Sequence, residues 1–182
     1  MMPQWTSDDE GLPTEFSTKR AFNQVETISK KPHYVGSKNY EVVANYLVKE
    51  LNKLGLQTSI QEGYTLSDWG NLVQPKNILA RIKGSNNSKA LLLLSHYDSA
   101  PHSYYPGASD AGSGVATILE SVRAFLHNKS PHKNDIIILF SDAEELGLNG
   151  AALFVTQHPW AKEVGLVLNF EARGSSGPSY ML

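Results

Sequence analysis

The sequence predicts an α/β fold: a three-layer sandwich in which helices cover both faces of a mostly parallel, mixed central sheet. Segments of helical periodicity alternate along the chain with apolar segments of strand length, an order typical of such sheets. Three apolar segments, residues 90–95, 135–141 and 165–170, are continuous rather than alternating, which is typical of strands buried on both faces. The 182 residues are enough for a single domain with a sizeable core.

Two amphipathic helices are expected in the N-terminal part of the chain. Apolar side chains recur at near-helical spacing in residues 15–30. From Tyr40 to Leu54 they recur closely at i, i+3, i+4 and i+7, which predicts a helix with one apolar face. Ser37 is placed to cap the start of this helix, and Gly55 is placed to end it.

The remaining elements follow from alternation and punctuation. Residues 57–62 and 77–83 alternate between apolar and polar side chains and predict two strands, with an irregular loop over residues 63–76 between them. Helical periodicity over residues 111–127 and 146–157 separates the three continuous apolar strands. This order of elements is what the three-layer sandwich requires.

The two ends of the chain set the expected domain boundaries. Residues 1–14 read as a loose polar lead-in, and residues 15–182 are expected to form a single domain. The sequence stops soon after the last strand-like segment, with no helix to close the sheet. We therefore expect this domain to be incomplete in the chain.

Composition excludes several classes of partner and ligand. A net charge of −2 gives no reason to expect binding to nucleic acid or to an anionic membrane. Cysteine is absent, so any metal must be held by His, Asp and Glu side chains. The N-terminal residues do not resemble a secretory signal, and no apolar run approaches the ~18 residues of a membrane span. The cellular compartment and the oligomeric state stay open.

Acidic residues and one histidine follow the three continuous strands. In open α/β sheets, ligands bind just beyond the carboxyl ends of the strands, so side chains at those ends of neighbouring parallel strands share one rim. Asp110 lies where the helix after the first strand begins, and it can join them. The candidate site residues are His96, Asp98, Asp110, Glu144, Glu145 and Glu171.

Several carboxylates in one cleft repel each other unless a cation is present or some of them are protonated. A divalent metal removes this repulsion. One imidazole with several carboxylates suits Zn²⁺, with Mn²⁺ or Co²⁺ as alternatives. The residues alone therefore predict a hydrolytic metal site at this rim.

Four motifs in this order resemble those of the M28 family of zinc aminopeptidases, within the di-zinc exopeptidases. They are His96-Tyr97-Asp98, the segment Gly107 to Gly114, the segment Asp142 to Gly150, and the segment Asn169 to Gly174. The last motif is most similar to the branch that contains membrane-anchored metallopeptidases of the endoplasmic reticulum and the vacuole. The resemblance covers residues from about 30 to the end, and it implies the phosphorylase/hydrolase-like architecture of these zinc peptidases.

The resemblance also implies the metal ligands. His96 and Glu171 would bind the first zinc ion, Glu145 would bind the second, and Asp110 would bridge the two. The family's last ligand to the second metal is a histidine further downstream, and this chain ends at Leu182 before reaching it. We therefore expect the second zinc to bind weakly and the activity of this chain to be low or absent.

The catalytic roles are likewise implied by the resemblance. Glu144 would be the general base that takes a proton from the attacking water and returns it to the leaving amine. Asp98 would hold the second nitrogen of the His96 imidazole and so fix its tautomer. Asp142, which precedes the glutamate pair, is expected to be structural. The implied reaction is removal of N-terminal residues from peptide substrates.

Three other interpretations stay open at this point. Glutaminyl cyclases share the architecture but use one zinc for an acyl transfer, and retention of Asp110, Glu145 and Glu171 together with His96 argues against this. A binding module that has lost its metals is a second alternative, although it would have no need of Glu144. The third is that this chain is a fragment that folds without turning over substrate.

Overall fold

The computed structural model describes residues 11–86, 89–101 and 103–172 of the chain. Its main sheet has five strands among these residues, and four of them run in the same direction, with only β4 antiparallel to its two neighbours. The expected mixed and mostly parallel sheet is therefore confirmed. In spatial order the strands are β1 (Thr58–Glu62), β4 (Lys76–Ile82), β6 (Ile136–Ser141), β5 (Ala90–His96) and β7 (Val164–Asn169).

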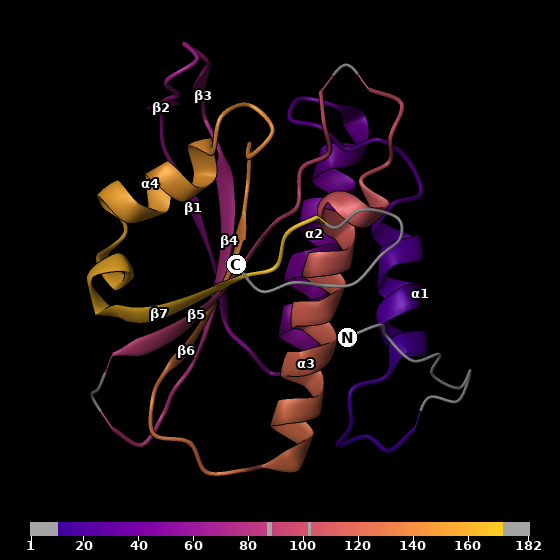
Figure 1. Ribbon diagram of the computed structural model, residues 1–182, viewed down its shortest axis with the longest axis vertical. Coiled ribbons are helices and arrows are strands. Elements are labelled where there is room, and N and C mark those ends of the chain that lie inside the picture. The colour runs from indigo at the N-terminus through magenta and orange to yellow at the C-terminus, as the bar shows by residue number, and fades with distance from the viewer. Residues whose placement is uncertain (1–10, 87–88, 102, 173–182) are drawn as a thin grey trace.

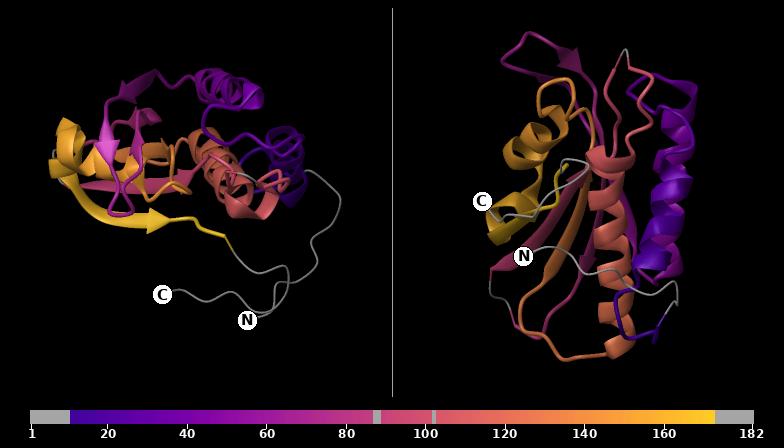
Figure 2. Two further views of the ribbon diagram at one scale, coloured as in Figure 1. Left: turned by 90° about the horizontal axis from the view of Figure 1, so that it is seen from above. Right: turned by 45° about the vertical axis from the view of Figure 1, so that its right-hand side comes forward.

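Helices cover both faces of this sheet, as Figures 1 and 2 show. On one face lie α2 (Lys38–Lys53) and α3 (Gly114–Asn128), with α1 (Thr18–Ile28) packed against α3. On the other face lie α4 (Asn149–Gln157) and the short 3-10 helix η2 (Pro159–Glu163). The expected three-layer sandwich is present.

The sequence of β6 is continuously apolar because this strand contributes to two cores. In β6, Ile138 and Phe140 pack into the core formed with α1, α2 and α3. Ile137 and Leu139 alternate with them and pack on the opposite face against Phe154 of α4. Since successive side chains of a strand point to opposite faces, a strand with a core on each side must be apolar at every position.

Local signals explain where the second helix begins and ends. The Ser37 side chain accepts a hydrogen bond from the backbone N–H of Tyr40, which caps α2 as expected. Gly55 follows the helix with a φ of 79°, a conformation that favours glycine. The apolar face predicted for this helix is buried, with Leu47 and Leu51 fully covered.

The expectation of an irregular loop over residues 63–76 was wrong in part. This segment holds a small antiparallel hairpin made of β2 (Thr65–Leu66) and β3 (Leu72–Val73). The Asn149 side chain, at the start of α4, hydrogen-bonds the Thr65 hydroxyl and so ties the hairpin to that helix. Strands of two residues are too short to show a periodicity, so the tertiary contacts decide their existence.

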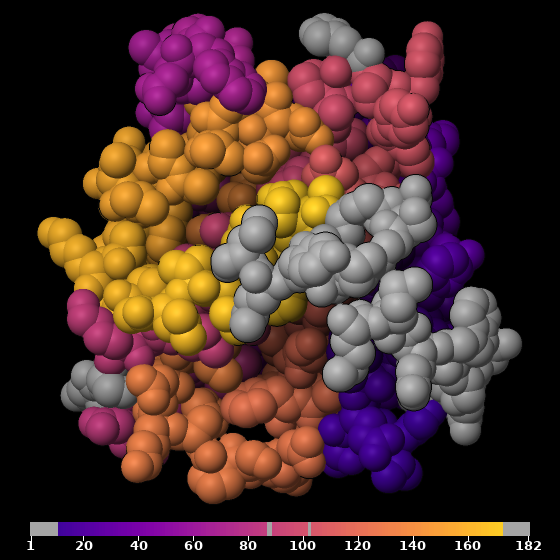
Figure 3. All heavy atoms as spheres, in the orientation of Figure 1, coloured from indigo at the N-terminus to yellow at the C-terminus, as the bar shows by residue number. Residues whose placement is uncertain are grey.

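The expectation that residues 165–170 form a fully buried strand was also wrong. β7 lies at one edge of the five-stranded sheet, and within the described residues it pairs only with β5. Leu166 is 59% exposed, and the neighbouring apolar side chains of β7 are similarly open. Figure 3 shows the yellow atoms of β7 at the molecular surface. A continuous apolar sequence therefore predicted the strand but not the depth at which it lies.

Candidate metal centre

His96 lies at the carboxyl end of β5 with its side chain almost completely buried. The imidazole Nδ1 lies 3.0 Å from the backbone carbonyl oxygen of Asp98. A proton on Nδ1, donated to that carbonyl, leaves Nε2 facing the site, and its lone pair can bind a metal once Nε2 has lost its own proton. The strand and this hydrogen bond together fix the position and the orientation of the ring.

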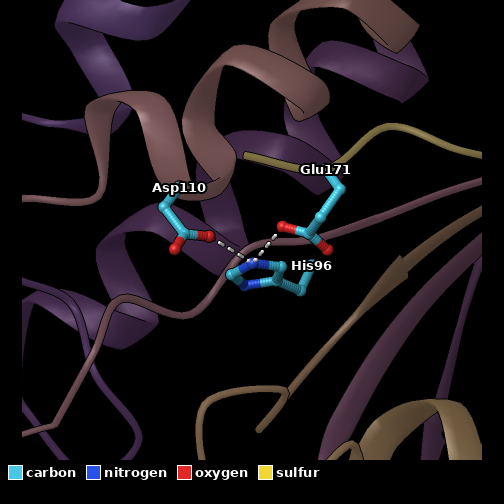
Figure 4. Close-up of side chains that lie close together, drawn as sticks. All are labelled: His96, Asp110 and Glu171. Atoms are coloured by element: carbon cyan, nitrogen blue, oxygen red, sulfur yellow. Dashed lines mark hydrogen bonds and ion pairs between the residues drawn. The ribbon is translucent and has the colours of Figure 1, made fainter. Parts of the chain in front are cut away.

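Two carboxylates face Nε2 of His96, as Figure 4 shows. Oδ1 of Asp110 lies 2.9 Å from Nε2, and Oε1 of Glu171 lies 3.4 Å from it. The three ligand atoms all lie within 4.8 Å of one another. Because Asp110 and Glu171 are both about half exposed, this rim of the sheet is open to solvent. A buried imidazole nitrogen between two accessible carboxylates is a donor set that suits zinc.

Asp110 is delivered by an irregular start to the third helix. The helix predicted over residues 111–127 is α3, preceded by the π-helical segment η1 (Ala108–Ser113). Gly107 adopts a φ of 67° before this segment, and its carbonyl accepts a hydrogen bond from Gly112. Asp110 itself has an extended backbone, with φ −109° and ψ 99°, and the Asp110–Ala111 peptide bond is cis. The sequence predicted the helix but not this irregular turn.

The glutamate pair approaches the same imidazole from the end of β6. Oε2 of Glu144 lies 3.9 Å from Nε2 of His96, so this carboxylate borders the three-residue cluster. The Glu145 carboxylate is not a member of that cluster. The structure thus brings His96, Asp110 and Glu171 together, with Glu144 beside them, and leaves Glu145 outside this ligand set.

Asp98 makes further contacts besides the expected one to the second imidazole nitrogen of His96. Its carboxylate accepts hydrogen bonds from the backbone N–H groups of Glu144, at 3.0 Å, and Glu145, at 3.2 Å. Its Oδ1 also lies 3.4 Å from Nδ1 of His96. The buried Asp98 side chain therefore connects the histidine to the glutamate pair. Sequence reasoning missed the link to the two amides, because backbone donors leave no trace in the residue pattern.

The charges of the site shift several pKa values. Burial lowers the pKa of His96, but the hydrogen bond and charge of Asp98, with the nearby glutamates, outweigh burial and raise it to about 10. Burial also raises the pKa of Glu144, and burial together with the charge of Asp110 raises that of Glu145 to about 7. In the absence of metal, one positive imidazolium thus partly balances the acidic cluster.

Residues 77–182 match the family model of peptidase family M28. This match covers more than half of the chain. The chain belongs to peptidase family M28. The resemblance found in the motifs is thereby confirmed, and the matched region contains all six candidate site residues. Residues 173 and 174 of the last motif lie outside the part that the structure describes.

Named relatives of this M28 chain include a "Vacuolar membrane protease" of Candida dubliniensis. It is 34% identical over 176 residues, which cover 90% of this chain and 18% of that protein. A similar protein of Schizosaccharomyces japonicus with the same name is 36% identical over 175 residues, 89% of this chain and 20% of its own length. The chain thus spans about a fifth of these relatives. Among the residues that the structure describes, no helix has the length and apolar character needed to cross a membrane.

Solved structures share the fold. A Zn-dependent exopeptidase from Parabacteroides distasonis superposes with a TM-score of 0.63 at 26% identity, covering 76% of this chain and 50% of its own. The glutaminyl cyclase of Porphyromonas gingivalis gives a TM-score of 0.63 at 27% identity, covering 72% of this chain and 47% of its own. The α/β architecture of this M28 chain therefore occurs in both classes of enzyme.

Proposed function

We propose that this chain carries the catalytic rim of a zinc-dependent aminopeptidase that removes N-terminal residues from peptides. The observation that supports this most directly is the buried His96 imidazole, with the carboxylates of Asp110 and Glu171 against Nε2 and Glu144 at its border. Membership of family M28 and the likeness to a zinc-dependent exopeptidase support the same reaction class.

The donor set gives each side chain a role. His96, Asp110 and Glu171 would hold the first zinc ion, and Asp98 would fix the imidazole through its carbonyl and carboxylate. When bound, zinc would polarise the scissile carbonyl and lower the pKa of a bound water. Glu144 would take the proton of the attacking water and pass it to the leaving amine, and its raised pKa brings it closer to neutral pH for this transfer.

The proposal extends to a second ion. Asp110 would bridge the two metals, and Glu145, whose carboxylate lies outside the three-residue cluster, would bind the second one. Asp110 and Glu145 are the two side chains proposed for the second zinc among the described residues, so this ion would be held more weakly than the first. Calorimetric titration of this chain with zinc is expected to show one tight site and one weak site. Two tight sites would contradict this part of the proposal.

The role of Glu144 is tested by Glu144→Gln, measured on a leucyl anilide together with zinc content by elemental analysis. The amide cannot accept the proton, so the rate should fall by about 100-fold or more while zinc is retained. Glu26→Gln, an exposed change on α1, is the matched control and should leave both measurements unchanged. Full activity in the Glu144 variant would remove this residue as the base.

Glutaminyl cyclisation is the second candidate, because a glutaminyl cyclase shares the fold at a TM-score of 0.63. The chain keeps His96, Asp110, Glu145 and Glu171 together, which favours the peptidase, because a single catalytic zinc ion uses three protein ligands. Two assays on the zinc-loaded chain distinguish the candidates. Release of ammonia from a peptide with N-terminal glutamine, without hydrolysis of the leucyl anilide, would favour the cyclase.

A further inference from the structure

Asp142 is a completely buried carboxylate that lies two residues before the proposed base. Its Oδ2 accepts hydrogen bonds from the Tyr40 hydroxyl of α2, at 2.6 Å, and from the backbone N–H of Lys76 on β4, at 2.7 Å. Its Oδ1 accepts the backbone N–H of Ala143 at 2.7 Å. Three donors from three parts of the chain therefore meet on one side chain at the end of β6.

Two tyrosines, Tyr40 and Tyr97, extend this hydrogen-bond network to the segment that carries His96 and Asp98. The rings of Tyr40 and Tyr97 are stacked with their centroids 5.7 Å apart. The Tyr97 hydroxyl donates to the Lys76 carbonyl at 2.9 Å and lies 3.0 Å from the Tyr40 hydroxyl. Tyr97 stands between His96 and Asp98 in the sequence, so the network connects the segment that carries His96 to the segment that carries Glu144.

Two buried carboxylates accept hydrogen bonds from three consecutive backbone amides, in the segment that follows β6 and carries the glutamate pair. Asp142 accepts the N–H of Ala143, and Asp98 accepts those of Glu144 and Glu145. Asp98 belongs to the metal site, whereas Asp142 anchors the same segment to α2 and β4 behind it. The segment is thus held from two sides, one facing the metal and one facing the core.

We propose that Asp142 is a positioning residue for the general base. Through Tyr40 and the Lys76 and Ala143 amides, it fixes the path of the backbone that places Glu144 beside His96. This inference rests on the proposed function, and it assigns a role in the reaction to a residue that touches neither the metal ligands nor the substrate. A displacement of about 1 Å in a catalytic side chain can cost about 100-fold in rate, so this anchoring has a measurable consequence.

Asp135 provides the matched control because it is an equally connected carboxylate at the opposite end of β6. It is 6% exposed and accepts hydrogen bonds from the Gly84 amide and from the Arg81 and Lys83 side chains. Asp142→Asn and Asp135→Asn each replace a buried carboxylate with an amide of the same size. Only the first substitution should disturb the site.

The first measurement follows the backbone directly and does not need activity. Amide hydrogen exchange by NMR should show Ala143, Glu144 and Glu145 protected in the unmodified chain and in Asp135→Asn. In Asp142→Asn their exchange should accelerate by about tenfold or more, while the amides of β5 stay protected. Unchanged protection of these three amides in Asp142→Asn would overturn the proposal.

The second measurement is steady-state kinetics on the zinc-loaded chain with a leucyl anilide. Asp142→Asn should lower kcat by about 10–100-fold with little change in KM, and Asp135→Asn should keep the original kcat. A kcat that falls equally in both variants would reduce the role of Asp142 to general stability and overturn the proposal. If Asp142→Asn does not fold, Tyr40→Phe is used in its place. It removes only the hydroxyl donor to Asp142, and the same two measurements on this variant test the proposal.

An inactive unmodified chain would agree with the expected weak binding of the second zinc and would not count against the anchoring. In that case hydrogen exchange decides, together with the zinc affinity of the His96 cluster. Accelerated exchange at residues 143–145, with the zinc affinity unchanged in Asp142→Asn, would support positioning of the base segment. Normal exchange would refute it.

Discussion

His96 is a proposed zinc ligand whose pKa depends strongly on the charges around it. Its side chain is buried, which alone would favour the neutral imidazole. Asp98 on one side and the carboxylates of Asp110, Glu144 and Glu171 on the other favour the charged form. The resulting pKa of about 10 means that the metal-free site carries an imidazolium at neutral pH.

Zinc binding should therefore become tighter as the pH rises. Zinc needs the neutral imidazole, so it must displace the His96 proton throughout the range below a pKa of about 10. The affinity should increase by about tenfold per pH unit between roughly pH 6 and pH 9, with release of about one proton. Calorimetry in buffers of different ionisation enthalpy measures both quantities.

Two histidine variants serve as controls for this pH dependence. His96→Gln should abolish tight zinc binding, and His127→Gln, at the exposed end of α3, should leave it unchanged. An affinity that stays constant across this pH range would show that His96 is already neutral in the metal-free protein.

At the element scale, the site depends on a close approach between α3 and the end of β7. A Cβ at Gly114, the first residue of α3, would lie 2.3 Å from the Phe170 carbonyl oxygen and 2.5 Å from Oγ of Ser95. Ser95 itself donates a hydrogen bond to that carbonyl at 2.9 Å. Phe170 immediately precedes Glu171, so glycine at position 114 allows the Glu171 backbone to reach the imidazole.

Gly114→Ala should therefore weaken zinc binding. The added methyl forces the Phe170 backbone away, which costs about 1–3 kcal/mol and outweighs the gain in helix propensity of about 1 kcal/mol. Displacement of Glu171 should reduce zinc affinity by about tenfold or more. Zinc titration and chemical denaturation of the variant measure the two effects.

Gly55→Ala is the control, because a side chain at this position strains the backbone but contacts no other residue. Gly55 has a φ of 79°, and a Cβ there would meet no atom within 4 Å. This variant should lose about 1–2 kcal/mol of stability and keep its zinc affinity. Equal zinc affinities in the Gly114 and Gly55 variants would show that the approach of α3 to β7 does not control the site.

For the whole molecule, the three proposed metal ligands connect segments that are far apart in sequence. His96 ends β5, Asp110 lies in η1 and Glu171 follows β7, so an ion shared by the three would tie β5 to the segment before α3 and to the end of β7 at the edge of the sheet. The unfolded chain does not hold these side chains together. Zinc should thus stabilise the folded state by mass action.

Thermal unfolding with and without zinc tests this linkage. At free zinc of about 100 times the Kd, the stabilisation should be about 2.7 kcal/mol, and it should disappear on chelation. His96→Gln should show no shift in Tm on adding zinc. A zinc-dependent shift that persists in His96→Gln would place the stabilising ion elsewhere in the protein.

The parts of the site that sequence reasoning could predict are those that follow from strand direction. Three apolar strands that run parallel must end at one rim, so His96 and Glu171 were expected to meet there, and the structure brings them together. The hydrogen bonds of Asp142, which anchor the segment that carries Glu144 and Glu145, were not predictable in this way. The sequence predicts only a structural role for Asp142, and its partners, a side chain on α2 and two backbone amides, are brought close by packing.

The sequence by itself determined the class of the fold, the order of its main elements and the candidate residues for its chemistry. Hydrophobic periodicity reports whether a segment can form a strand or helix, and motif spacing reports which polar side chains share an edge. Only the tertiary structure decided the hairpin within residues 63–76, the exposure of β7 and the hydrogen bonds that anchor Glu144. These depend on which neighbour covers a strand and which donor meets a buried carboxylate, and neither is encoded in any single segment of the chain.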